Sequence, residues 1–470
     1  MDGFTGWWEK SCFIILLCVG AAVASQAQTL TTLVSFNGAN GQRPRASLVQ
    51  GMDGNFYGTT EAGGANGLGT IFRMTPGGAL TTLHSFDSAD GANPWAGLIQ
   101  TAYGLFYGTT YFGGSTGCGG SGCGAIFGMT PAGGFATLYS FNGTDGNNPN
   151  GGLAQAANGN LYGTTIGGGN NGYGSIFKTT PAGTLTPVYS FGGLSDGYSP
   201  FAGLIQATNG NLYGTSFGGY HSHGTVFRIT PAGVLTKLYD FDYTDGANPF
   251  GGLVQSADGN LYGTTSTGGT GGSNGTIFKI TPAGALITLY NFAYTDGSYP
   301  FAALVQAIDG NLYGTTVFGG TSGNGTVFQV TPGGTLTTLY SFCPQFFNCT
   351  DGYSPYGGLL QGTDGTFYGT TTLGGANGNA YGTVFRLSLG LSPFVKTLPA
   401  SAKVGAKVRI LGTNLTGATR VNFGATAAGF TVVSPSLISA TVPVGATSGK
   451  VRVATPGGTL VSNAVFRVMP

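Results

Sequence analysis

Carboxylates recur along this chain in a short motif, Asp-Gly-x-x-Pro. A ring of such side chains could hold cations or a polar ligand. Aspartate before glycine is also typical of a turn in which the carboxylate accepts hydrogen bonds from nearby backbone N–H groups. The first interpretation predicts a shared site and the second predicts separate turns. The motif begins at Asp90, Asp145, Asp196, Asp245, Asp296 and Asp351.

The residue after the proline of this motif is aromatic in most copies. Aromatic side chains offer both an apolar face and, in tyrosine and tryptophan, a polar handle. The set therefore predicts either a platform for sugar rings or peptide around a channel mouth, or packing between repeats. A divergent first copy, Asn40-Gly41 before Pro44, adds a seventh position. The seven residues are Arg45, Trp95, Asn150, Phe201, Phe250, Phe301 and Tyr356.

One loop gathers three carboxylates, at Asp240, Asp242 and Asp245. Calcium prefers several carboxylate oxygens on a flexible loop, so calcium is the one metal that this spacing suggests. The spacing differs by one residue from the familiar calcium loop, and no downstream glutamate supplies a bidentate ligand. We otherwise expect no cofactor. The histidine pair His221 and His223 lacks a third metal ligand nearby and is expected in an exposed loop.

Four cysteines follow residue 27, and they form two close pairs. Cys118 lies near Cys123, and Cys343 lies near Cys349, each pair within an insertion of the repeat. We expect two local disulfides, which fit an oxidising, exported compartment. A single zinc site made from all four is the alternative, although the pairs come from distant repeats.

Residues suited to enzyme chemistry are scarce. Glu61 is the only glutamate after residue 27, and no HExxH, Gly-x-Ser-x-Gly or Gly-Lys-Ser/Thr motif occurs. We therefore expect no catalytic residues, with a carbohydrate-active hydrolase or lyase working in the channel as the alternative. Only 7% of residues are charged and the net charge is +1. Without a basic patch, nucleic acid is not an expected partner.

The first 27 residues are typical of a secretory signal peptide. Residues 12–24 are apolar, a run too short to span a bilayer comfortably, and Ser25-Gln26-Ala27 offers small residues for cleavage. We expect a secreted or cell-envelope protein with no membrane span after cleavage.

The elements that carry these residues follow a repeat of about 51 residues. Each copy contains four expected strands, two tight turns with Asn-Gly or Pro-x-Gly, and two longer loops. Tight turns require antiparallel neighbours, so the repeat predicts a seven-bladed β-propeller over residues 28–388. The strand at residues 30–36 matches a fourth strand and would complete the last blade. The Tyr-Gly-Thr core occurs at Tyr57, Tyr107, Tyr162, Tyr213, Tyr262, Tyr313 and Tyr368.

The turns predict two unequal faces. The tight turns join the first strand to the second and the third to the fourth, so they share one face, here called the tight-turn face. The longer loops share the other, the long-loop face. Function on a rigid scaffold usually resides in loops, so the long-loop face is the candidate binding surface.

The repeat ends near residue 388. A linker at residues 389–393 precedes a region of short alternating strands at residues 394–470, with spacing typical of an immunoglobulin-like β-sandwich. The overall fold class is therefore all-β, with a propeller of four-stranded antiparallel blades followed by a sandwich.

Two family resemblances add to this reading. The C-terminal segments 408–415, 421–424 and Thr455-Pro456-Gly457-Gly458 resemble IPT/TIG domains, which implies a sandwich for protein interaction or spacing and no catalytic residues. The Gly-Leu-x-Gln, Asn-Leu-Tyr-Gly-Thr-Thr, Gly-Thr-Val-Phe and Thr-Pro-x-Gly blocks of residues 30–388 resemble bacterial GloVer-type tandem repeats of exported proteins.

Together these features predict an exported, non-enzymatic recognition or scaffold protein. The expected ligand is a polysaccharide or another cell-surface ligand, bound on the long-loop face. The alternatives are the channel enzyme named above and a purely structural spacer of the cell envelope.

Overall fold

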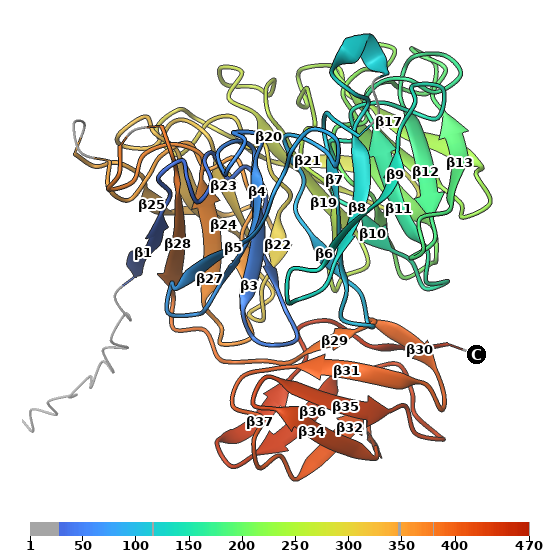
Figure 1. Ribbon diagram of the computed structural model, residues 1–470, viewed down its shortest axis with the longest axis vertical. Helices are drawn as coiled ribbons and strands as arrows, with labels where there is room; N and C mark the ends of the chain where they lie inside the picture. The colour runs from blue at the N-terminus through green and yellow to red at the C-terminus, as the bar shows by residue number, and fades with distance from the viewer. Residues whose placement is uncertain (1–27, 115–116, 346–348, 379, 470) are drawn as a thin grey trace, which may run out of the picture.

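The computed structural model describes residues 28–114, 117–345, 349–378 and 380–469. In these ranges the regular elements are all strands, with no α-helix and one 3-10 turn, η1 (Cys118–Gly120). Seven four-stranded antiparallel sheets follow one another in a ring, and further sheets lie below them (Figure 1). The prediction of an all-β, seven-bladed propeller is confirmed. No helix in the described ranges is long and apolar enough to cross a bilayer. The expected signal peptide lies outside them.

Each of the first six blades uses four consecutive strands, ordered from the channel outward as they occur in the chain. Blades 1 to 3 contain β2 (Val49–Gln50), β3 (Phe56–Thr60), β4 (Thr70–Met74), β5 (Leu80–Ser85), β6 (Ile99–Gln100), β7 (Phe106–Thr110), β8 (Ala125–Met129), β9 (Phe135–Ser140), β10 (Ala154–Gln155), β11 (Leu161–Thr165), β12 (Ser175–Thr179) and β13 (Leu185–Ser190). Blades 4 to 6 contain β14 (Ile205–Gln206), β15 (Leu212–Ser216), β16 (Thr225–Ile229), β17 (Leu235–Asp240), β18 (Val254–Gln255), β19 (Leu261–Thr265), β20 (Thr276–Ile280), β21 (Leu286–Asn291), β22 (Val305–Gln306), β23 (Leu312–Thr316), β24 (Thr326–Val330) and β25 (Leu336–Ser341).

The seventh blade joins the two ends of the propeller. It contains β26 (Leu360–Gln361), β27 (Phe367–Thr371) and β28 (Thr383–Ser388), and its outermost strand is β1 (Thr29–Ser35). β1 runs antiparallel to β28, with Leu30 opposite Leu387. Backbone hydrogen bonds between the first and last strands thus close the ring.

The Tyr-Gly-Thr segment lies in the second strand of every blade, and its tyrosine ring is buried between blades in all seven copies. Glycine is required next to it, because a Cβ at Gly163 would lie 2.4 Å from the Phe177 ring and 2.9 Å from the Leu153 side chain. Phenylalanine from the third strand and leucine before the first strand therefore meet over this glycine. Truncating such a buried aromatic ring to alanine typically costs about 3–5 kcal/mol.

The innermost strands approach so closely that small residues are needed near the axis. A Cβ on Gly151 would lie 2.3 Å from the backbone nitrogen of Gly203, and one on Gly203 would lie 2.3 Å from the carbonyl oxygen of Gly152. Thr59 ties neighbouring blades together here, since its hydroxyl donates to the Ala96 carbonyl at 3.0 Å. These contacts hold neighbouring blades close together near the axis.

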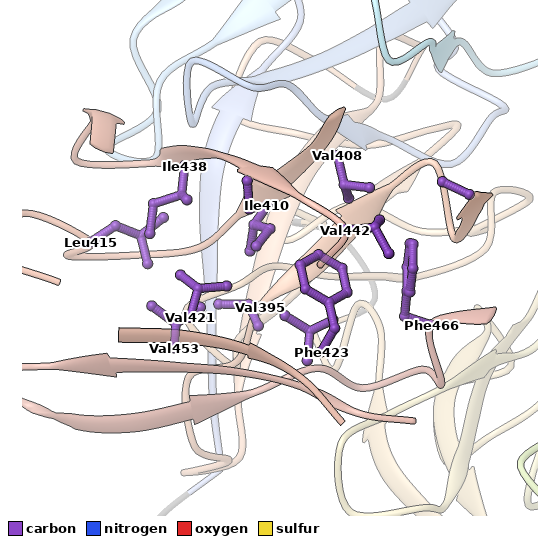
Figure 2. Packing of buried hydrophobic residues seen from close by; sticks show 13 residues of the cluster. Val395, Val408, Ile410, Leu415, Val421, Phe423, Ile438, Val442, Val453 and Phe466 are labelled. Carbon is purple, nitrogen blue, oxygen red and sulfur yellow. The ribbon is translucent and has the colours of Figure 1, made fainter. Parts of the chain in front are cut away.

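The C-terminal region forms two four-stranded sheets and one parallel pair. Valine, isoleucine and phenylalanine side chains from both four-stranded sheets fill one common core (Figure 2). The strands are β29 (Lys396–Leu398), β30 (Ser401–Lys403), β31 (Lys407–Leu411), β32 (Arg420–Phe423), β33 (Thr426–Ala427), β34 (Phe430–Ser434), β35 (Leu437–Thr441), β36 (Val451–Thr455), β37 (Gly458–Val461) and β38 (Arg467–Met469).

These C-terminal sheets lie against the tight-turn face of the propeller (Figure 1). The hydroxyls of Thr363 in blade 7 and Thr413 lie 2.9 Å apart. The Ser436 hydroxyl donates to the Met52 carbonyl of blade 1 at 2.9 Å. On the far side of the axis, the Arg467 guanidinium donates to the Thr208 carbonyl of blade 4. The tight-turn end of the channel is therefore covered, and the long-loop end is not.

Candidate ligand-binding site at the mouth of the propeller channel

Seven half-buried side chains, one from each repeat, line a cavity of about 240 Å³ on the long-loop face. We call it the ring cavity. Each of the seven follows the recurring proline of its repeat, which is the position that the sequence analysis predicted. The structure thus brings the whole predicted set together, and ligand binding by it stays a prediction. The lining residues are Arg45, Trp95, Asn150, Phe201, Phe250, Phe301 and Tyr356.

An unusual backbone conformation places these side chains. The residue before each proline has a positive φ, between 49° and 57°, although none of the seven is glycine. In blade 6 this residue is Tyr299, whose N–H donates to the Asn274 carbonyl of blade 5 at 3.0 Å and whose carbonyl accepts from Val317 at 3.1 Å. Such strain costs of order 1–3 kcal/mol per residue and persists only when its surroundings enforce it. The seven positions are Arg43, Asn93, Asn148, Ser199, Asn248, Tyr299 and Ser354.

One arc of the ring cavity is a continuous aromatic wall. The ring centroids of Phe201 and Phe250 lie 4.9 Å apart, and those of Phe250 and Phe301 lie 4.8 Å apart. Tyr356 continues the series, with its centroid 5.3 Å from that of Phe301. These distances are typical of favourable aromatic pairs. The wall offers flat apolar faces suited to stacking.

The opposite arc is polar. The Arg45 guanidinium lies 4.9 Å from the Tyr356 ring centroid and 5.4 Å from that of Trp95, within cation–π range of both. Its Nε lies 2.6 Å from a Glu61 carboxylate oxygen, an ion pair without the in-line geometry of a hydrogen bond. The Asn150 amide donates to the Phe201 carbonyl at 2.9 Å and so joins the two arcs. The cavity therefore combines stacking surface with a charged group on one side.

The Trp95 indole adds a polar feature to this arc. Its ring stacks on Tyr111, with centroids 4.0 Å apart and an interplanar angle of 22°. Its buried Nε1–H has no acceptor among the described residues. An unpaired buried donor is costly to the folded state.

The six recurring aspartates lie in separate turns and do not line the ring cavity. In blade 5, for example, Asp296 accepts a hydrogen bond from the Ala293 N–H at 3.0 Å and from the Tyr290 hydroxyl at 2.6 Å. Burial, and then the hydrogen bond to Asp296, raises the pKa of Tyr290 to about 12. In the turn that follows blade 1, His84 takes the place of the tyrosine, with Nε2 2.7 Å from Asp90. These contacts account for the recurrence by turn formation; a role in ligand binding stays a prediction.

The three carboxylates considered for calcium point to different partners. Asp240 pairs with Lys237 at 2.5 Å, Asp242 accepts hydrogen bonds from Thr244, and Asp245 accepts one from Tyr239. In the ranges that the structure describes, no three histidine, cysteine, aspartate or glutamate side chains are grouped as metal ligands. His221 and His223 contact aromatic neighbours, Tyr220 and Tyr243 respectively. Calcium binding stays untested.

Both expected disulfides are present. Cys118 is bonded to Cys123, and Cys343 to Cys349. Each closes a loop on the long-loop face, so the pairing confirms two local links instead of one four-cysteine zinc site.

A known protein family matches most of this chain. The model of the Gloeobacter/Verrucomicrobia repeat matches residues 21–120, 116–308 and 272–441. The chain belongs to the Gloeobacter/Verrucomicrobia repeat family. No curated protein matches the sequence.

Solved structures similar to this repeat protein show its fold. A fungal alcohol oxidase of the AA5 family, in complex with copper, aligns over 94% of this chain and 99% of its own, with TM-score 0.52 and 16% identity. The extracellular domain of a putative hybrid two-component system from B. thetaiotaomicron aligns over 94% of this chain and 59% of its own, with TM-score 0.50 and 12% identity. The ring cavity presents no histidine, cysteine or carboxylate of its own, so its donor set does not fit copper.

The repeat also contains contacts that sequence reasoning missed. The glutamine of the Gly-Leu-x-Gln block is a link between blades: Gln206 Oε1 accepts the Ala157 N–H of blade 3 at 2.8 Å, and its amide donates to the Gly210 carbonyl of its own blade. The strained residues before proline were missed too. The recurring glutamine was a usable signal, since a repeated polar residue beside an apolar strand calls for a partner.

Proposed function

We propose that this member of the Gloeobacter/Verrucomicrobia repeat family is an exported, non-enzymatic recognition protein that binds carbohydrate in the ring cavity. The observation that carries the proposal is that seven residues of five different types, at one position of the repeat, converge on a single open cavity. A position used only for packing between blades needs no such asymmetry. The proposed ligand is a polysaccharide or other surface glycan.

The shape and chemistry of the ring cavity support a sugar. Its volume of about 240 Å³ is smaller than that of most drug-sized sites, so it suits one ring or the end of a chain. The Phe250–Phe301–Tyr356 wall offers faces on which a pyranose can stack, and Arg45 and Asn150 offer donors for hydroxyl or carboxylate oxygens. A protein ligand would need more surface than this cavity supplies.

The placement of carboxylates favours binding over catalysis. Glycoside hydrolysis uses two carboxyl groups, roughly 5–10 Å apart, on either side of the bond that breaks. The lining of the ring cavity includes neither aspartate nor glutamate. Glu61 reaches it only through its ion pair with Arg45.

Export and a second contact surface complete the proposal. Two local disulfides are typical of proteins that mature in an oxidising compartment, which supports secretion or the cell envelope. The C-terminal sheets, which we propose to be an IPT/TIG-like immunoglobulin-type sandwich, would contact a protein partner or act as a spacer.

A glycan array tests this function directly. We expect selective binding by the intact chain and loss of that signal in Phe301→Ala and Trp95→Ala. Tyr103→Ala is the matched control, because Tyr103 is 83% exposed in the β6–β7 turn on the tight-turn face. Binding that survives both ring substitutions would contradict the proposed site, and absence of any glycan signal would contradict the proposed ligand class.

A further inference from the structure

A second cavity lies at the other end of the channel, between the propeller and the C-terminal sheets. Its volume is about 540 Å³, and its walls come from the inner strands of blades 1 to 4 and 7 and from β29, β31 and β38. We call it the base chamber. It shares no lining residue with the ring cavity. Ligand sites of about this size are common where two domains meet.

Lys396 of β29 is placed in this chamber by strand alternation. Its neighbours Val395 and Thr397 are buried, and Val395 belongs to the core of the C-terminal sheets. Because successive side chains alternate between the faces of a strand, Lys396 points the other way, toward the propeller. β29 runs directly beneath the propeller (Figure 1). The lysine keeps accessible surface because the chamber around it is hollow.

The base chamber contains positive charge with no negative charge to balance it. Arg467 joins Lys396 in the lining, and none of the lining side chains is an aspartate or glutamate. Neither cation takes part in an ion pair in the described part of the chain. Desolvation by the surrounding walls lowers the pKa of the Lys396 ammonium group, although the side chain keeps accessible surface.

The remaining walls are mostly apolar. Leu48, Leu98 and Leu153 line the propeller side, and Leu398 and Leu411 line the opposite side. Among the glutamines in the propeller wall of the chamber, one amide oxygen lacks a hydrogen-bond donor in the described part of the chain. Gln155 donates to the Gly159 carbonyl, but its Oε1 lacks the inter-blade N–H that Gln206 accepts. The chamber thus offers apolar walls, two cations and one spare amide oxygen.

We propose that the base chamber is a binding site for a small organic anion, with its carboxylate or sulfonate at Lys396 and Arg467 and an apolar body against the leucine walls. An anion there restores the missing counter-charge, and a hydrogen bond to a charged group is stronger than a neutral one. A fatty acid offers this chemistry, because it carries a carboxylate at one end of an apolar chain. The site is independent of the carbohydrate site proposed at the mouth.

The test uses the full secreted chain and the fluorescent anion 8-anilinonaphthalene-1-sulfonate. We expect one site per chain, with affinity reduced about tenfold or more in Lys396→Met, which keeps the length of the side chain and removes the charge. Lys403→Met, on the exposed lysine of β30, is the matched control and should bind as the wild type does. The uncharged N-phenyl-1-naphthylamine should bind both proteins equally.

A second variant and two competitors complete the test. Leu398→Trp fills the chamber without removing the charge and should abolish binding of both fluorophores; thermal unfolding checks that each variant is folded. Displacement of the anion by decanoate supports a fatty acid, and displacement by glucuronate, which has no apolar body, would contradict the role given to the leucine walls. Equal anion affinity in wild type and Lys396→Met, or displacement by neither acid, would overturn the proposal.

Discussion

The two ends of the propeller channel obtain their chemistry from different parts of the chain. The ring cavity is built from one repeat position that holds a different residue in several blades, including Arg45, Trp95 and Asn150. The base chamber owes its charges to Lys396 and Arg467, which lie outside the repeat. The two proposed sites therefore differ in origin: one varies a single position within the symmetry of the repeat, and the other forms where the C-terminal sheets cover its axis.

The two cavities lie at different ends of the channel and share no lining residue. Substitutions at one end should therefore leave binding at the other end unchanged.

The largest effect is expected at the mouth. Trp95→Ala and Phe301→Ala each remove an aromatic anchor from a small site, where such truncations typically cost 2 kcal/mol or more, about 30-fold in affinity. Titration calorimetry with a glycan identified on the array measures this loss. Binding of the fluorescent anion at the base should not change; a parallel loss there would mean that the two ends are coupled.

The next effect is expected at the base. Lys396→Met should weaken the fluorescent anion about tenfold and leave the glycan affinity at the mouth within error. The Lys403→Met variant controls for the loss of a lysine that does not line the base chamber. A change in glycan affinity in Lys396→Met but not in Lys403→Met would show that the two ends of the channel are coupled.

A smaller effect concerns the ion pair beside the ring. Glu61→Gln leaves Arg45 half-buried without its counter-charge and should lower the free energy of unfolding by about 1 kcal/mol, because the pair is partly exposed to solvent. Urea unfolding of the wild type and the variant measures this difference in free energy. The double variant Arg45→Met/Glu61→Gln should recover part of the loss; no recovery would show that the pair is not coupled.

The smallest effect lies in a hairpin of the tight-turn face. Hydrogen bonds from Asn260, Lys279 and Tyr262 outweigh the effect of burial and hold the pKa of Asp258 well below its usual range. A carboxylate whose pKa is lowered in the folded state stabilises the protein above its unfolded pKa, and this contribution is lost as pH falls. The unfolding free energy should therefore fall below about pH 4 less steeply in Asp258→Asn than in wild type. Equal slopes of unfolding free energy against pH in the two proteins would contradict this prediction.

Much of the propeller was predictable because its signals are local and repeated. Seven Tyr-Gly-Thr segments and the tight turns between them define blades, since turn chemistry and strand alternation act over a few residues. The ring position followed from its constant offset after proline. The contacts between the ring residues, such as those of Arg45 with Trp95 and Tyr356, join residues far apart in the chain. They form only when the propeller closes.

Other features could not be predicted, for physical reasons. Residues before proline ordinarily avoid a left-handed backbone, so the strained conformation of Tyr299 and its six counterparts runs against local preference and is imposed by hydrogen bonds from two blades. The base chamber depends on how the C-terminal sheets dock beneath the propeller. No local pattern around Lys396 distinguishes it from an ordinary exposed lysine.

The most direct test of the account measures one glycan against two variants. Calorimetric titration of an array-identified glycan into wild-type, Phe301→Ala and Lys396→Met protein should give wild-type affinity for Lys396→Met and a loss of about 30-fold for Phe301→Ala. Undiminished binding by folded Phe301→Ala would contradict the claim that the ring cavity at the mouth of the channel is the recognition site.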